Sequence, residues 1–342
     1  MTRAAWSHKD PKKFVFYTNA RGIEYGVRSG TTFADEWCRQ QWTARPFNRE
    51  SGHAYDLDPV KSYADCAVVW YKAMVETGAA DAIYWDDVFP SGDFNLGVTD
   101  AYRAADGEIQ PSCGIFAMRA LIRRCAAMMA EIGKDPRDNW VHMTNTAMAP
   151  VSAFAGVHYD WEDTAGDTTI QERYTRAYVL ATAIGRQMGC RVGVMGYFAT
   201  KDPKSDKLRW LERTGTGACI ANELEWPRVK QWRDLHGRLC EWGYRRPETK
   251  VWNDFDEDVP FPVAVQGPGC AALAMARGGE ALVVVSDWSE GGEYELAPDC
   301  AALGTPQGFS ACDFETGAPL RVEDGRVRLS LKKHDFAVVR LK

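Results

Sequence analysis

Short apolar segments that alternate with helical segments are the feature that most constrains the fold of this chain. The apolar segments are rich in β-branched and aromatic residues, whereas the segments between them repeat apolar residues at helical spacing. Strands are expected at 14–18, 81–86, 140–145, 156–160, 191–198 and 218–222. Helices are expected at 60–77, 112–132, 170–188, 205–214 and 228–243. This alternation predicts right-handed βαβ units and a parallel sheet.

Polar or acidic residues follow directly after each of these six strands. In a (β/α)8 TIM-type barrel the carboxyl ends of the strands gather at one face, and that face binds the ligand. The sequence therefore predicts an α/β fold with a TIM-type barrel, of which about six βα units are recognisable and two strands are not.

The pattern changes after about residue 250. Short strands at 281–288, 308–314, 326–331 and 336–341 are separated by Gly, Pro and Asp turns and have no helical period. Such a pattern is typical of a small antiparallel β-sandwich. We therefore predict a barrel domain over 1–248 and a β-sandwich domain over 249–342.

Two adjacent carboxylates end one of the predicted barrel strands. Asp86 and Asp87 follow a run of four residues that favour a buried strand, and Pro90-Ser91-Gly92 then breaks it. Adjacent strand residues point to opposite faces, so both acids reach one site only if the backbone bends there. The alternative is that one Asp caps the next turn and the other is solvated.

Further polar and aromatic residues lie at or near the other strand ends and in the connecting loops. The candidates for substrate binding are Asn19, Trp37, Trp85, Asn95, His142, Asn145, His158, Asp160, Trp161 and Glu223. Sugar-binding clefts use flat rings as platforms, and the chain has 13 Trp. Packing is the alternative role for each Trp, structural hydrogen bonding is the alternative for the His residues, and core pairing or loop capping is the alternative for Glu223.

Charge and cysteine usage narrow the classes of partner. The net charge of −6 provides no basic stripe for nucleic acid. No apolar run approaches the ~20 residues of a membrane span, and no signal-peptide core is visible. The ten Cys are scattered without metal-ligand spacing, so we expect buried thiols, a reducing cytoplasmic environment and no metal site.

One barrel strand ends Ile83-Tyr84-Trp85-Asp86-Asp87, and the chain also has Asn95, Arg119, His142, an acidic strand exit at 160–163 and a β-domain after the barrel. Together these features resemble glycoside hydrolases. The chain is most similar to the family 123-like group, which holds β-N-acetylgalactosaminidases, and more distantly to the α-galactosidase clan. The resemblance covers roughly residues 13–342 and implies that no organic cofactor is needed.

The clan resemblance also implies a strand count. If Asp86 ends barrel strand four, the 160–163 segment ends strand six, 218–222 is strand eight, and the usual N-terminal part with strands one and two is missing. Enzymes of family 123 use an adjacent Asp-Glu pair, with the Glu as general acid and the Asp orienting the substrate's acetamido group. Here the second member is Asp87, which is one methylene shorter than Glu.

Glycoside hydrolysis by two carboxylates needs one protonated and one ionised group. A separation of roughly 5–5.5 Å favours retention, and one of roughly 6.5–9.5 Å favours inversion. Asp86 or Asp87 is expected to supply the ionised group. Glu162 is expected to supply the acid, because Trp161 would desolvate it and raise its pKa, with Asp160 and Asp163 as replacements.

The sequence thus predicts a glycoside hydrolase that acts on an oligo- or polysaccharide. The alternative is a non-catalytic carbohydrate-binding or assembly subunit that keeps the barrel fold. The two unrecognised strands would leave an open seam, so a second copy of the chain or a partner segment is expected to cover it.

Overall fold

The computed structural model describes residues 13–19, 21–23, 27–38, 55–142, 148–162, 164–183 and 189–342. The chain divides into two compact units, and each is described by itself. Unit 1 comprises Met1–Asp160 and Gly185–Arg191, and unit 2 comprises Trp161–Ile184 and Val192–Lys342, as far as these residues are described. The predicted boundary at 248/249 is a different division and stays a prediction.

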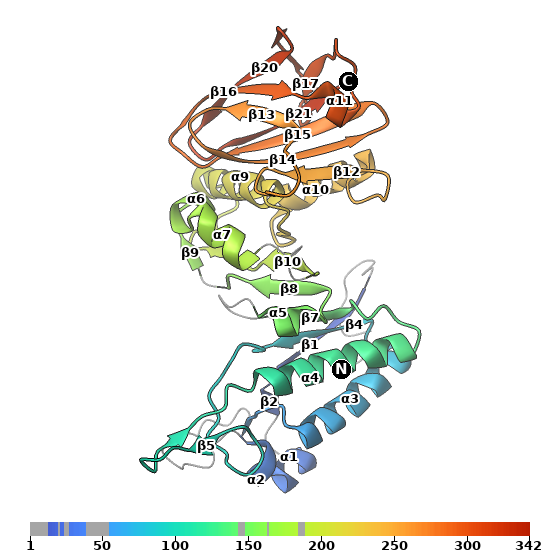
Figure 1. Ribbon diagram of the computed structural model, residues 1–342, viewed down its shortest axis with the longest axis vertical. Coiled ribbons are helices and arrows are strands. Elements are labelled where there is room, and N and C mark those ends of the chain that lie inside the picture. The colour runs from blue at the N-terminus through green and yellow to red at the C-terminus, as the bar shows by residue number, and fades with distance from the viewer. Residues whose placement is uncertain are drawn as a thin grey trace. The chain divides into compact units, whose positions relative to one another are not determined.

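A parallel sheet forms the centre of unit 1, as the alternating pattern predicted (Figure 1). Its strands are β1 (Val15–Asn19), β4 (Ala82–Asp86), β7 (Asn139–His142) and β8 (Val157–Asp160). The sheet order is β1-β4-β7-β8-β10, where β10 is Arg191–Val194. The described strands form an open five-stranded sheet rather than a closed eight-stranded barrel, so the predicted fold is present in part.

Two long helices cover one face of this sheet (Figure 1). They are α3 (Lys61–Glu76) and α4 (Ile115–Glu131). Every third or fourth residue of α3 is buried, and the core beneath the two helices contains Ile83, Trp85 and Val141 of the strands. Because strand side chains alternate, their neighbours Tyr84, Asp86 and His142 point to the opposite face.

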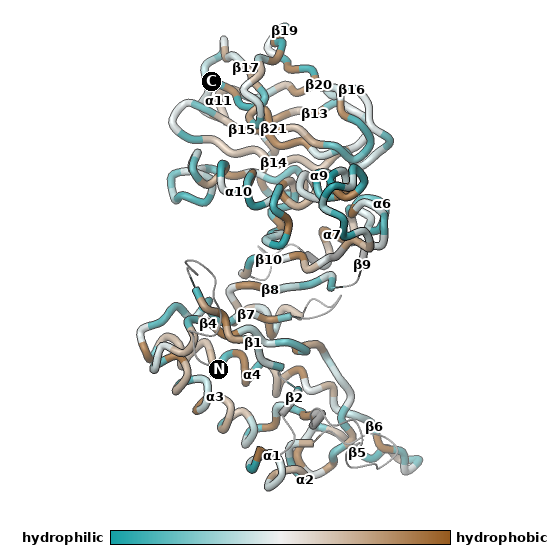
Figure 2. Tube along the Cα trace, turned by 180° about the vertical axis from the view of Figure 1, so that it is seen from behind, coloured by the Kyte–Doolittle hydropathy of each residue, from teal (hydrophilic) through white to brown (hydrophobic). Residues whose placement is uncertain are grey.

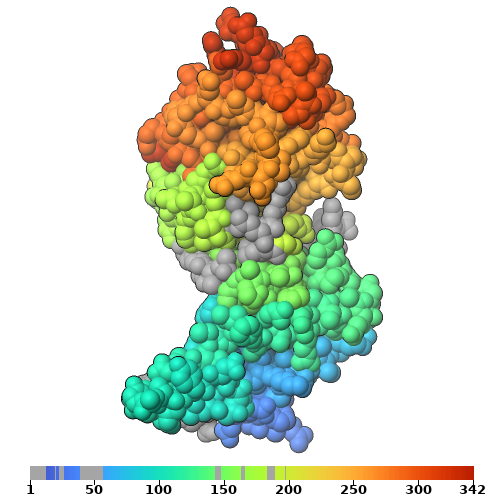
Figure 3. All heavy atoms as spheres, in the orientation of Figure 1, coloured from blue at the N-terminus to red at the C-terminus, as the bar shows by residue number. Residues whose placement is uncertain are grey.

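Shorter elements complete unit 1. They are β2 (Gly22–Ile23), α1 (Arg28–Thr32), α2 (Ala34–Trp37), β3 (Tyr55–Asp56), β5 (Tyr102–Arg103), β6 (Ile109–Gln110) and α5 (Ala149–Ser152). β2 pairs with β3 and β5 pairs with β6, both antiparallel. The segment that carries the β5–β6 pair projects from the body of this unit (Figure 3).

Unit 2 begins with short elements and two longer helices. They are β9 (Thr164–Gly166), α6 (Ile170–Arg173), α7 (Arg176–Ala183), β11 (Tyr197–Phe198), α9 (Asp206–Ala221) and α10 (Lys230–Trp242). The predicted strand at 218–222 is wrong, because α9 continues through Ala221. A bridge at Glu225 pairs with Gly193 of β10 in parallel instead.

Glycines explain why α9 reads as interrupted in the sequence. A Cβ at Gly215 would lie 2.2 Å from a ring carbon of Trp226, and one at Gly217 would lie 2.5 Å from Cβ of Phe336. Both positions therefore require glycine for close packing, even though glycine weakens a helix interior. The glycines of this stretch are therefore explained by tertiary contacts, and they do not mark the end of a helix.

Antiparallel strands fill the rest of unit 2, as predicted. They are β12 (Lys250–Asn253), β13 (Val263–Gln266), β14 (Cys270–Arg277), β15 (Glu280–Asp287), β16 (Gly291–Pro298), β17 (Ala311–Asp313), β18 (Pro319–Leu320), β19 (Val322–Glu323), β20 (Arg326–Lys332) and β21 (Phe336–Leu341), with α11 (Cys300–Leu303) between β16 and β17. The sheets run β12-β14-β15-β21-β17-β18 and β13-β16-β20-β19. Side chains from both sheets form one apolar core, and β14 and β15 are hydrophobic along much of their length (Figure 2).

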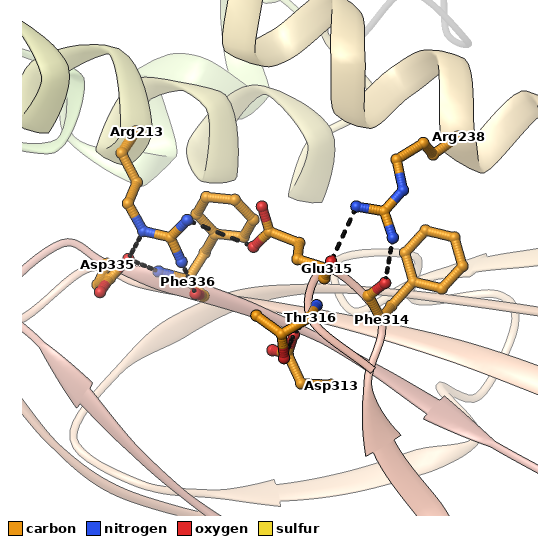
Figure 4. Close-up of polar contacts among 8 residues, drawn as sticks. All are labelled: Arg213, Arg238, Asp313, Phe314, Glu315, Thr316, Asp335 and Phe336. Carbon is orange, nitrogen blue, oxygen red and sulfur yellow. Dashed lines mark hydrogen bonds and ion pairs between the residues drawn. The ribbon is translucent and has the colours of Figure 1, made fainter. Parts of the chain in front are cut away.

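Two arginines join the helices of unit 2 to the larger sheet (Figure 4). Arg213 of α9 donates to Asp335 at 2.6 Å and to the Phe336 carbonyl at 3.0 Å, and its guanidinium lies 4.4 Å from the Phe336 ring centroid. Arg238 of α10 donates to the Phe314 and Glu315 carbonyls at 2.5 and 3.1 Å. These contacts connect α9 to the start of β21 and α10 to the turn after β17.

No helix among the described residues is both long and apolar enough to cross a membrane.

Candidate active site

The carboxyl ends of β1, β4 and β7 bring three predicted site residues together. The parallel register pairs Asn19 with Asp86 and Trp85 with Val141, so His142 lies beside Asp86 on the other side. The central position in this row belongs to Asp86, whose side chain is 19% exposed. The site therefore lies where a parallel α/β sheet places its ligand.

Three donors converge on the carboxylate of Asp86. Nδ1 of His142 lies 2.9 Å from Oδ1, the backbone N–H of Asp87 donates to Oδ1 at 2.9 Å, and the Tyr17 hydroxyl donates to Oδ2. Burial alone would raise the pKa of Asp86, but the hydrogen bonds from His142 and Tyr17 outweigh it and hold the pKa below its usual range. Asp86 is therefore ionised at neutral pH.

The backbone bends at Asp87, as two adjacent acids at one site require. Asp87 has φ +55°, a left-handed conformation that is uncommon for a residue with a side chain. Its carboxylate accepts a hydrogen bond from the side-chain amide of Asn19. Both acids are thus hydrogen-bonded to side chains of β1, Asp86 to Tyr17 and Asp87 to Asn19.

Two residues that the sequence did not indicate support this turn. Arg21 is buried and donates to the carbonyls of Asp87 and Phe89 at 3.1 and 2.7 Å. Its guanidinium also lies 3.3 Å from Asp58, which is buried as well. A buried Arg–Asp pair is formed by the tertiary fold, and no local sequence signal reveals it.

Aromatic rings line the face of the sheet that carries Asp86. Tyr17 stacks on Tyr84 with ring centroids 5.6 Å apart, and Tyr84 lies 5.7 Å from Tyr159. Trp140 continues the row at 6.0 Å from Tyr159. Tyr17 is 60% exposed, so the end of this row nearest Asp86 offers an accessible ring. The alternation along β4, which places Tyr84 on the same face as Asp86 and Trp85 on the opposite face, was the signal that could have indicated it.

His158 and Asp160 lie on β8 of unit 1 and are both buried. Nε2 of His158 is 4.0 Å from Oδ2 of Asp160, as expected for residues two apart on one strand face. Asn95 is also buried in unit 1, where its side chain accepts from the Gly97 amide and donates to the Asp35 carbonyl. These contacts give Asn95 a role in folding its loop.

Trp37 and Trp85 are core residues. They are 2% and 0% exposed, and their indole N–H groups donate to Ser62 and Asn139 at 2.8 and 2.6 Å. A sugar platform needs an open ring face, so this burial corrects the expectation for both rings. Packing, the alternative role, accounts for their positions.

The remaining predicted residues belong to unit 2 or lie outside the described residues. Trp161 is 1% exposed and stacks on Tyr174 at 4.5 Å, so its ring is also covered. Glu162 is exposed, so it lacks the desolvation by Trp161 on which its predicted role depended. Glu162 and Asp86 belong to different units, so the distance between their carboxylates stays a prediction. Asn145 and Asp163 lie outside the described residues.

Glu223 follows helix α9 and not a strand, which corrects its predicted position. Its carboxylate accepts from Asn253 at 3.0 Å and from the Tyr244 hydroxyl at 3.3 Å. These partners fit the structural role that was the alternative for this residue. In the part of the chain that the structure describes, no group of three or more His, Cys, Asp or Glu side chains is arranged to hold a metal ion.

Comparison with known proteins gives structural neighbours only. No family model matches the sequence, and no curated protein matches it. Among solved structures, the chain is similar to a family 27 β-L-arabinopyranosidase from Geobacillus stearothermophilus, with TM-score 0.56, 11% identity, and coverage of 96% of this chain and 74% of that one.

Two further neighbours are also glycoside hydrolases. A maltogenic α-amylase from Thermotoga neapolitana gives TM-score 0.52 at 10% identity, with coverage of 95% of this chain and 76% of that one. α-Galactosidase I from Mortierella vinacea gives 0.50 at 9%, with coverage of 96% and 76%. These neighbours are TIM-barrel glycoside hydrolases with C-terminal β-sheet domains. At these identities the likeness concerns the fold.

Proposed function

We propose that the chain is a glycoside hydrolase whose ionised catalytic carboxylate is Asp86. The observation that carries the proposal is the position of this carboxylate, at the carboxyl end of a central parallel strand and partly open to solvent. Donors from His142, Tyr17 and the Asp87 amide keep it charged. Such a group can attack an anomeric carbon or stabilise the positive charge that develops there.

The other roles follow from the neighbours of Asp86. Asp87 and Asn19 form a hydrogen-bonded pair that can orient a hydroxyl or amide group of the sugar. The exposed ring of Tyr17 offers an apolar face to a pyranose. The general acid stays the prediction from the sequence, which is Glu162 with Asp160 and Asp163 as replacements. The Asp86-Asp87 pair supports a resemblance to the family 123-like group, although the shorter second acid differs from the Glu of that group.

A matched set of variants tests this proposal on a panel of 4-nitrophenyl glycosides. Asp86→Asn should lower turnover by at least about 10²-fold, because the neutral amide cannot take the role of the carboxylate. The control is Asp81→Asn at the opposite end of the same strand, where Asp81 accepts a hydrogen bond from the Phe14 amide at 2.8 Å. If Asp86→Asn cleaves the glycosides as fast as Asp81→Asn does, the assignment of Asp86 is refuted.

Glu162→Gln tests the acid separately. Loss of an acid that protonates the leaving group should lower turnover most on glycosides with poor leaving groups, and least on 4-nitrophenyl glycosides. A variant that cleaves both kinds of substrate as fast as the parent would transfer the role to Asp160 or Asp163.

The alternative is a non-catalytic carbohydrate-binding subunit, which the row of rings from Tyr17 to Trp140 favours. Binding of oligosaccharides by calorimetry, without cleavage of any glycoside in the panel, would support it. Strand β1 ends the described sheet, and a second copy or another chain segment beside that strand remains our proposal for the open seam.

A further inference from the structure

We infer that Arg21, held by Asp58, is a positioning residue that fixes the turn at Asp87 and through it the carboxylate of Asp86. The inference rests on the proposed function for its catalytic meaning. The geometry itself lies entirely within unit 1.

The guanidinium of Arg21 is enclosed, and three oxygen atoms of described residues bind it. Its side chain is 4% exposed, and that of Asp58 is 2% exposed. Nε donates to the Asp87 carbonyl at 3.1 Å, and one terminal nitrogen donates to the Phe89 carbonyl at 2.7 Å. The other terminal nitrogen lies 3.3 Å from Oδ1 of Asp58. A buried charge needs such a partner, so Asp58 holds the guanidinium in place.

The two carbonyls that Arg21 binds lie on either side of Val88. The Val88 side chain is fully buried, and its backbone N–H donates to the His142 carbonyl at 3.1 Å. The turn is thus held by Arg21 on two carbonyls and by β7 on the amide between them. A left-handed backbone at a residue such as Asp87 costs of order 1 kcal/mol or more. These several hydrogen bonds to the turn together hold Asp87 in that conformation.

Arg21 also reaches the acids by a second route. Its own backbone N–H donates to Oδ1 of Asn19 at 2.7 Å, which leaves the Asn19 nitrogen to face the carboxylate of Asp87. The Asp87 amide in turn donates to Oδ1 of Asp86 at 2.9 Å. A shift of Arg21 would therefore change the orientation of both carboxylates without any direct contact with substrate.

Lysine cannot replace this arrangement, because its single ammonium group lacks the planar fork that reaches two carbonyls and a carboxylate. Arg21→Lys keeps the charge beside Asp58 and removes only the fork, so it is the informative variant. Arg213→Lys is the matched control. Arg213 also has three oxygen partners among the described residues, two acids and one carbonyl, but it binds them in unit 2 between α9 and the sheet.

The first readout is steady-state kinetics of the full-length variants on the 4-nitrophenyl glycosides that the parent cleaves. We expect Arg21→Lys to lower kcat by about 10- to 100-fold with KM within about 3-fold, because displacement of a catalytic group mainly affects the transition state. Arg213→Lys should lower the urea midpoint and leave kcat unchanged. An Arg21→Ala variant should regain turnover when guanidinium ion is added at concentrations far below those that unfold proteins.

The second readout needs no substrate. The carboxyl of Asp86 is titrated by ¹³C NMR in the parent and in Arg21→Lys, and we expect its pKa to rise toward the ordinary value as the Asp87 amide moves away. If the parent cleaves no glycoside, the proposed function fails while this titration still decides the positioning role. An unchanged titration in a folded Arg21→Lys variant overturns the inference, as does an unchanged kcat where the parent is active.

Discussion

Replacement of Gly217 by alanine tests a close contact between helix α9 and strand β21 of unit 2. Gly217 lies inside helix α9, and a Cβ there would lie 2.5 Å from both Cβ and Cγ of Phe336. These atoms are the base of the side chain on β21, so they cannot move away without a shift of the strand itself. Gly217→Ala should therefore force α9 and the sheet apart.

The expected magnitude is the difference of two effects. Alanine favours a helix interior over glycine by about 1 kcal/mol. Overpacking in a close-packed core costs typically 1–3 kcal/mol, and this contact calls for the upper end of that range. The net destabilisation is then about 2 kcal/mol. With a urea dependence of about 3 kcal/mol per M, the midpoint of unfolding should fall by roughly 0.7 M.

Gly237 provides the control in the neighbouring helix α10. A Cβ at Gly237 would meet no atom within 4 Å, so Gly237→Ala should raise stability by about 1 kcal/mol through helix propensity alone. Both variants are measured by tryptophan fluorescence in urea. A Gly217→Ala variant as stable as the parent, beside a stabilised Gly237→Ala variant, would refute the contact between α9 and β21.

The remaining predictions concern the site and the helix–sheet contact. Tyr17→Phe removes one of the hydrogen bonds that lower the pKa of Asp86, so that pKa should rise and the acid limb of the kcat/KM profile should move to higher pH. Ionised Asp86 contributes stability that is fully present above its pKa in the unfolded chain and is lost as pH falls through its pKa in the folded protein. In Tyr17→Phe this contribution should be lost at a higher pH, as measured by urea titrations. Arg213→Ala leaves Asp335 and Glu315 without their partner and should lower the free energy of unfolding by about 1–3 kcal/mol, because these groups are partly exposed.

Local signals account for what the sequence predicted. The apolar run before Asp86 and the breaker after Phe89 define a strand and its end from neighbouring residues alone. Side-chain alternation makes a bend the condition for both acids to reach one site, and the backbone at Asp87 is left-handed. Strand pairing then places His142 and Asn19 beside the acids, because parallel strand ends share one edge.

Long-range packing accounts for what the sequence did not predict. Strand β14 contains four alanines in eight residues, a composition that favours helix. It is a strand because β15 pairs with it along its whole length and β12 along half of it. Helix α9 contains two glycines that only the nearby Trp226 and Phe336 explain. Arg21 and Asp58 are separated by 37 positions, so their pairing is visible only in three dimensions.

The backbone at the end of β8 gives Trp161 a different role from the one its sequence suggested. Trp161 has φ +56°, nearly the value at Asp87, and both residues come directly after a parallel strand. Asp tolerates this conformation, whereas a bulky residue adopts it only when its surroundings compel it. Packing holds Trp161 in this conformation, because its ring is fully buried and stacks on Tyr174 and Tyr178 with ring centroids 4.5 and 6.4 Å apart. Burial of so large a side chain contributes about 2–3 kcal/mol, enough to offset the strain. The ring of Trp161 thus anchors the start of unit 2, and Glu162 is the first residue that follows it.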